Sequence, residues 1–154
     1  MIERIRQLIG ENSMCVLATC HNNVPHCSFM TYVANPEAGI IYMVTRKETR
    51  KYTNLLNNPQ VSLLIDTRSK QGLEQRTSIQ ALTISGVCTT IEEPAEVESF
   101  RRQILDEHPH LKELVEHPDA AVISVRANSF LLLDGALHAH YVSAAAVDSA
   151  FNSV

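Results

Sequence analysis

Three short apolar runs, separated by turns too short to hold a helix, constrain the fold of this chain most strongly. The runs are Met14–Cys20, His26–Ala34 and Ile40–Thr45, and turn-forming residues fill the gaps at His21–Pro25 and Asn35–Gly39. Parallel strands need a crossover of about a dozen residues or more, so linkers this short join antiparallel neighbours. We therefore expect an antiparallel sheet rather than alternating strands and helices.

The later segments add strands and helices to this beginning. Apolar or β-branched runs predict strands at 61–66, 78–91 and 120–133, and Gly86 within the second of them predicts a bulge. Helical spacing predicts helices at 1–11, 48–57 and 92–118, the last interrupted at His108-Pro109. The polar segment 67–76 is expected to be a loop, and the tail from about residue 143 to fray or to pack on a partner. The expected fold class is mainly β with helical additions, as an antiparallel barrel in a single domain over residues 1–154.

Composition excludes several classes of function. The chain has 154 residues, 45% of them apolar, and a net charge of −4, so it lacks the basic field that nonspecific nucleic-acid binding requires. Its apolar runs are too short to cross a bilayer, and the first residues lack the apolar centre of a signal peptide. We expect a cytoplasmic protein with no membrane partner. No Cys-x-x-C occurs, and the pair His138 and His140 lacks nearby acidic or thiol ligands, so we predict no metal site.

The segment Thr45-Arg46-Lys47-Glu48-Thr49-Arg50-Lys51 is the strongest candidate for a binding site. It contains four of the thirteen basic residues and lies where a predicted strand ends and a helix begins. Unpaired N–H groups and the positive end of the helix dipole attract anions at such a place, and Arg, Lys and Thr side chains add hydrogen bonds. This composition suits a phosphate monoester, although a solvated basic turn has the same composition.

From Val16 to Ile91 the sequence resembles the pyridoxamine 5′-phosphate oxidase-like family of FMN-binding split β-barrels. The resemblance depends on an ordered series rather than on one motif. In this order come Val16-Leu17-Ala18-Thr19, Thr49-Arg50-Lys51 where the family often has Ser-Arg-Lys, Asn57-Asn58-Pro59-Gln60-Val61-Ser62-Leu63, and Ile84-Ser85-Gly86-Val87.

The resemblance implies a six-stranded Greek-key split β-barrel that forms a homodimer and holds FMN at the dimer interface. By position, Thr45, Thr49, Arg50 and Lys51 would bind the flavin phosphate. Met30, Thr31 and Tyr32 would lie along the isoalloxazine ring, partly through backbone groups. Gln80, or Ala81 if the spacing is shifted by one residue, matches a family glutamine that reaches the flavin.

The sequence also departs from the true oxidases of this family. Ser28 and Val33 stand near the places where the oxidases carry Arg and Lys, and no Trp is present. The oxidase pattern Arg-Leu-His-Asp-Arg is replaced by Ala136-Leu137-His138-Ala139-His140, which keeps only the His, as His138, our candidate catalytic residue. We therefore expect an FMN-dependent oxidoreductase of unidentified substrate rather than a pyridoxamine phosphate oxidase. The alternatives are a noncatalytic flavin binder, a haem-binding relative that uses His138 or His140, and a deazaflavin-dependent reductase.

Overall fold

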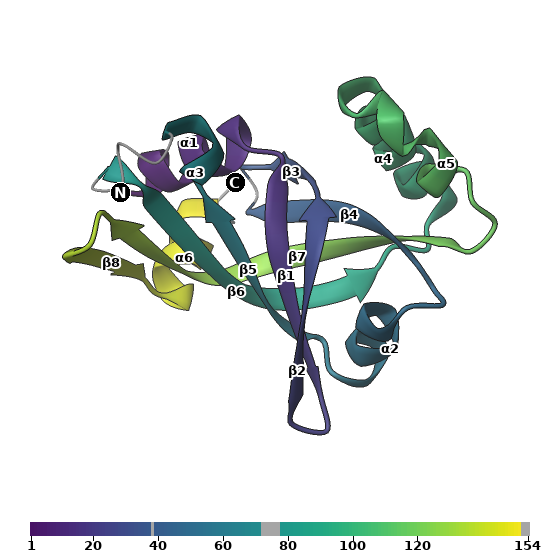
Figure 1. Cartoon of the computed structure of the whole chain (residues 1–154), viewed down its shortest axis with the longest axis horizontal. Coiled ribbons are helices and arrows are strands. Elements are labelled where there is room, and N and C mark those ends of the chain that lie inside the picture. The colour runs from purple at the N-terminus through teal and green to yellow at the C-terminus, as the bar shows by residue number, and fades with distance from the viewer. Residues whose placement is uncertain (38, 72–77, 152–154) are drawn as a thin grey trace.

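The computed structural model of the chain describes residues 1–37, 39–71 and 78–151, which form one antiparallel sheet with helices around it (Figure 1). The strands are β1 (Met14–His21), β2 (Val24–Thr31), β3 (Val33–Asn35), β4 (Ile40–Arg46), β5 (Gln60–Asp66), β6 (Gln80–Thr90), β7 (Ala120–Asp134) and β8 (His138–Val142). The helices are α1 (Ile2–Glu11), α2 (Arg50–Asn57), α3 (Arg68–Gln71), α4 (Pro94–Glu107), the 3₁₀ turn η2 (Pro109–Leu111), α5 (Lys112–Val115) and α6 (Ala144–Phe151).

The strand order in the sheet is β2-β1-β5-β6-β7-β4-β3, and β8 pairs with β7 outside this path. Every strand pair is antiparallel. Within this order, β5, β6 and β7 are consecutive and β4 lies beside β7, which is the arrangement of a Greek key. The sheet curls into the half-barrel of a split-barrel fold, and the antiparallel β architecture predicted from the sequence is confirmed.

The expected number of six strands is not confirmed, because eight strands form among the described residues. The segment predicted as one strand over His26–Ala34 is interrupted at Tyr32, so that β2 and β3 lie at opposite ends of the sheet order. The Tyr32 backbone N–H donates to the Ser13 carbonyl at 2.8 Å, and its buried hydroxyl donates to the Ile9 carbonyl at 2.8 Å. These two hydrogen bonds anchor the break between β2 and β3 to α1 and to the residue that precedes β1. The other strand beyond the expected six is β8, which follows β7 and pairs with it as a hairpin.

The bulge predicted at Gly86 is confirmed by a register shift between Ser85 and Gly86, where β6 pairs with β7. A Cβ atom at position 86 would lie 2.4 Å from the Arg126 carbonyl oxygen. Glycine therefore allows a closer approach of the two strands than any other residue could.

Two groups of buried side chains hold the helices in place. The larger group fills the half-barrel, and α1 contributes Ile5, Leu8 and Ile9 to it. The smaller group lies under α4 and α5, where Phe100 and Ile104 pack against strand residues such as Val44. None of the helices within the described residues has both the length and the apolar character to cross a membrane.

The tail from residue 143 does not fray where the structure describes it, and the expectation that it packs on a partner stays a prediction. It forms α6, whose Val147 is buried in the larger core and whose Ala150 carbonyl accepts a hydrogen bond from Arg6 at 2.8 Å. This helix was not predicted from the sequence. Within the expected loop 67–76, residues 68–71 form α3, and residues 72–76 lie outside the described residues.

Candidate functional site

A pocket of about 280 Å³ lies where β2, the β4–α2 corner and the α4–α5 region meet. One side is formed by Phe29, Met30 and Thr31 of β2. The corner contributes polar side chains, and the helices contribute an apolar wall. Five of the residues predicted from the sequence to bind a flavin line this one pocket: Met30, Thr31, Thr45, Thr49 and Lys51.

Local hydrogen bonding determines the shape of the corner. Thr49 is the N-cap of α2, and its hydroxyl oxygen accepts the Tyr52 backbone N–H at 3.3 Å while its proton goes to the Arg46 carbonyl at 2.8 Å. The buried Thr45 hydroxyl lies 3.4 Å from that of Thr49. The first N–H groups of α2, including those of Arg50 and Lys51, have no acceptor within the helix. Two hydroxyls and the positive end of a helix thus point toward the same end of the pocket.

Lys51 supplies the positive charge of the pocket. Its side chain is half-buried, and this burial lowers the pKa of its ammonium group below the ordinary value for lysine. No carboxylate pairs with it among the described residues. An unpaired cation held partly out of water gains most from an anionic ligand. Arg50 is exposed beside it and does not line the pocket.

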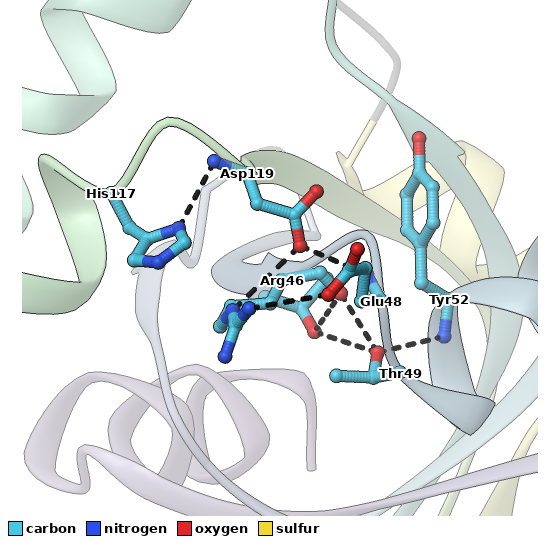
Figure 2. Close-up of polar contacts among 7 residues, drawn as sticks. Arg46, Glu48, Thr49, Tyr52, His117 and Asp119 are labelled. Carbon is cyan, nitrogen blue, oxygen red and sulfur yellow. Dashed lines mark hydrogen bonds and ion pairs between the residues drawn. The ribbon is translucent and has the colours of Figure 1, made fainter.

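Arg46, by contrast, is already paired (Figure 2). Its guanidinium lies 3.7 Å from the Asp119 carboxylate and 3.5 Å from that of Glu48. Asp119 also accepts the Glu48 backbone N–H at 3.0 Å through its side chain and the Lys47 N–H at 2.9 Å through its carbonyl. The Asp119 N–H in turn donates to His117 Nδ1 at 3.0 Å. Asp119 therefore ties the corner to the loop that precedes β7 and neutralises Arg46.

The opposite wall of the pocket is apolar. Ile104 of α4, Leu111 of η2 and Leu114 of α5 form it, while Phe29 is 73% exposed at the pocket edge. A pocket with an apolar body and one cationic, donor-rich end suits a ligand that combines a planar ring system with a phosphate. The Thr45 and Thr49 hydroxyls can rotate from the Arg46 carbonyl toward such an anion. The residues present therefore fit the phosphate end of FMN.

Three of the predicted site residues lie away from this pocket within the chain. Tyr32 is buried in the core. Gln80, at the other end of β6, accepts a hydrogen bond from Arg4 and donates to Asp134 at 3.1 Å. His138 is exposed on β8, directly opposite Asp134. The roles assigned to these three residues stay predictions.

Residues from distant parts of the chain complete the site, and these were not predicted from the sequence. Asp119 directly follows the segment 92–118 that the sequence predicts as helical, and only the Pro118-Asp119 turn before a strand could have drawn attention to it. The apolar wall was also missed, because Ile104 and Leu111 follow ordinary helical spacing. Among the described residues, no three His, Cys, Asp or Glu side chains form a group that could hold a metal ion.

Comparison with known proteins finds a matching family model, a curated relative and solved structures of the same fold. The chain matches the pyridoxamine 5′-phosphate oxidase family over residues 1–134. It is 24% identical over 163 residues to a pyridoxamine 5′-phosphate oxidase homolog of Schizosaccharomyces pombe, covering 88% of this chain and 86% of that protein.

Two solved structures with this fold carry names that refer to haem. A heme binding protein from Mycobacterium smegmatis superposes with a TM-score of 0.81 at 21% identity, covering 96% of this chain, which spans only 60% of that protein. HutZ, a heme storage protein from Vibrio cholerae, superposes with a TM-score of 0.70 at 20% identity, covering 86% of this chain and 93% of that one. At these identities the likeness shows the shared fold alone.

Proposed function

Since the chain belongs to the pyridoxamine 5′-phosphate oxidase family, we propose that it binds FMN in the pocket between β2, α2 and α4 and acts as an oxidoreductase. One observation carries the proposal: the unpaired, half-buried Lys51 and two threonine hydroxyls share one end of a pocket whose opposite wall is apolar. Bound FMN supplies the electron-transfer chemistry. The chain binds, orients and shields it.

In this proposal the polar corner holds the phosphate. Lys51 provides a charge-assisted hydrogen bond, and Thr45 and Thr49 provide neutral ones. Arg50, which does not line the pocket, adds positive charge beside it. Met30 and Thr31 border the ring, with the apolar side chains of Ile104, Leu111 and Leu114 excluding water on the other side. Asp119 keeps the corner in place.

We further propose that the protein is a homodimer with the flavin at its interface. Phe29, Met14 and Val24 are exposed on the surface of β1 and β2, and Phe29 also borders the FMN pocket. A second copy seated on this surface would bury the three side chains and cover the pocket. Such a partner could also bring Gln80 and His138 to the flavin, since neither reaches the pocket within one chain.

A phosphorylated substrate is a poor fit to this pocket. Arg46 is neutralised by Asp119 and Glu48, which leaves Lys51 as the unpaired cation lining the described pocket. The FMN phosphate would pair with Lys51, so a phosphate group on the substrate would have no unpaired cation in the described pocket to bind it. We therefore propose a substrate or electron donor without a phosphate group, which departs from pyridoxamine phosphate oxidation.

Haem binding is the second candidate function. Two observations favour it: structures of the same fold are named for haem, and His138 and His140 are both exposed on β8, two residues apart and so on one side of the strand. Exposed imidazole side chains of this kind are suitable ligands for haem iron. This candidate requires no role for Lys51.

The visible spectrum of the purified protein separates the two candidates. Flavin gives two broad maxima, whereas haem gives one intense sharper band. We expect the flavin spectrum, and we expect the double variant Arg50→Ala/Lys51→Ala to lose a few kcal/mol of FMN binding free energy, at about 1.5–3 kcal/mol per charged hydrogen bond. Fluorescence titration with FMN measures this loss.

A matched control removes the same charges elsewhere. Arg102→Ala/Lys112→Ala also deletes one Arg and one Lys, both exposed and outside the FMN pocket, and should leave FMN affinity unchanged. Equal affinity of the Arg50→Ala/Lys51→Ala variant and the parent protein would refute the phosphate assignment. A haem band that disappears in His138→Ala/His140→Ala would establish the second candidate instead.

The shared site can be tested by mixing two defective proteins. Neither Arg50→Ala/Lys51→Ala nor His138→Ala should reoxidise reduced flavin at the parent rate. If a site takes its phosphate corner from one protomer and His138 from the other, mixed dimers regain one intact site of two. Failure to regain activity in proven mixed dimers would place both contributions in one chain.

A further inference from the structure

We propose that a second cavity, on the other side of Val44 from the FMN pocket, binds a small carboxylic acid with an apolar body. The cavity has a volume of about 280 Å³ and lies between α2, α4, α5, the end of β6 and the start of β7. Val44 is the one residue that lines both cavities. This second cavity, which we call the acid pocket, does not depend on the proposed flavin site.

The acid pocket contains cationic donors that the protein leaves without acidic partners. Lys47 comes from the β4–α2 loop and Arg101 from α4. Neither forms an ion pair among the described residues, and Arg101 makes one hydrogen bond, to the Val115 carbonyl at 2.9 Å. Its remaining N–H groups are available in the fork geometry that matches a carboxylate.

Tyr52 adds a buried donor to this cluster. The residue is 8% exposed, and its hydroxyl oxygen accepts a hydrogen bond from Thr90 at 3.4 Å. That arrangement leaves the phenolic proton without an acceptor among the described residues. In Figure 2 the Tyr52 ring extends away from the Thr49 hydroxyl, and Tyr52 does not line the FMN pocket. A buried hydroxyl proton without an acceptor favours a ligand that accepts it.

The rest of the acid pocket sets the nature of the ligand. Val97, Val115 and Val122 line it with apolar surface, and Glu92, an exposed carboxylate, is the acidic residue among its lining. Glu92 makes a dianion less favourable than a monoanion. The volume lies just below the range of cavities that hold drug-sized molecules. Together these features select a compact monocarboxylate with a branched or aromatic body.

Benzoate is a suitable probe, titrated into the full-length protein while amide chemical shifts are followed by NMR. We expect saturable shifts in the segments around Lys47, Thr90 and Arg101. Benzyl alcohol has the same apolar body without the charge, and inorganic phosphate has charge without the body. Both should bind at least about tenfold more weakly, because each loses one of the two kinds of contact.

Two substitutions test the donors, with a matched control on the same helix. Arg101→Gln and Lys47→Gln should each weaken benzoate binding at least about tenfold. Arg102→Gln makes the same change one position further along α4, outside the acid pocket, and should have no effect. Lys47→Gln serves as a second variant because Arg101→Gln also removes the hydrogen bond to the Val115 carbonyl, whereas the Lys47 side chain forms no hydrogen bond or ion pair with the described residues. Thermal unfolding confirms that each variant is folded.

The outcomes separate this proposal from the flavin proposal. Benzoate binding should persist in Arg50→Ala/Lys51→Ala, whatever happens to FMN affinity. Equal binding of benzoate and benzyl alcohol, or equal weakening by Arg102→Gln and Arg101→Gln, would overturn the acid pocket. Tighter binding of phosphate than of benzoate would show a simple anion site and would also overturn it.

Discussion

The two ends of the long strands β6 and β7 differ in how they use their polar residues. At the corner end, near α2, polar groups face a pocket and Lys51 has no partner. At the hairpin end, near β8, Gln80 is held between Arg4 and Asp134. Figure 1 shows α2 and β8 at opposite ends of the molecule. One chain thus assembles the anion-binding end of the pocket by itself, whereas Gln80 at the hairpin end is engaged by Arg4 and Asp134 and reaches the pocket only in the dimer that we propose.

The largest effect we expect comes from the strands that connect the two ends. Gly86→Val would place side-chain atoms against the Arg126 carbonyl, 2.4 Å from the Cβ position. We expect a loss of about 3 kcal/mol or more in the free energy of unfolding, since backbone cannot move aside as a side chain can. Chemical denaturation measures it. A decrease of less than about 1 kcal/mol in the free energy of unfolding would show that β6 and β7 can move apart at position 86 without loss of stability.

The same substitution at each end compares them directly. Asp119→Ala removes the acceptor of the Glu48 N–H and the partner of Arg46, so we expect a loss of about 1–2 kcal/mol in stability and a several-fold weaker FMN affinity. Asp134→Ala removes an exposed acceptor of Gln80 and should change stability by no more than about 0.5 kcal/mol. Denaturation and FMN titration of both variants measure the contrast, and equal effects would contradict it.

The corner should also respond to pH. Burial lowers the pKa of Lys51 below the ordinary value for lysine, so the folded protein releases this proton at a lower pH than the unfolded chain does. The free energy of unfolding of the FMN-free protein therefore rises with pH between the two pKa values, and charged Lys51 is a cost below both. FMN needs the charged form, so its affinity should fall a few-fold as pH rises from about 7 to about 10.

Replacement of Lys51 tests whether this residue causes the pH dependence of FMN affinity. The flavin phosphate is already a dianion over most of that range. Lys51→Met should bind FMN weakly with a nearly flat pH profile, measured by fluorescence titration. A profile for Lys51→Met that matches the parent protein would assign the titration to another group.

The smallest effects should occur at the hairpin end. Gln80→Ala and Arg4→Met remove the two members of one side-chain hydrogen bond, and each should change stability by no more than about 0.5 kcal/mol. If Gln80 contacts the flavin in a dimer, Gln80→Ala alone should weaken FMN binding, by about 1 kcal/mol for a neutral hydrogen bond. Parallel FMN titrations distinguish the contact from a purely structural role, for which both variants would bind FMN equally.

Much of the fold could be predicted from the sequence because its signals are local. The turns around Pro25 and Pro36 indicated antiparallel neighbours, and Gly86 indicated the bulge, because turn and glycine chemistry act within a few residues. The break at Tyr32 could not be predicted. It depends on Ser13 and Ile9, which are distant in the sequence and accept hydrogen bonds only after the sheet has curled.

The candidate site divides in the same way. The polar corner could be located from the sequence alone, since Thr45, Thr49 and Lys51 lie on a strand end and the first helical turn that follows, where local geometry brings their polar groups together. Which of the cations is available depends on contacts made across the folded chain. Asp119, far along the chain, neutralises Arg46 but not Lys51, because ion pairing depends on distance in space and not on distance in sequence.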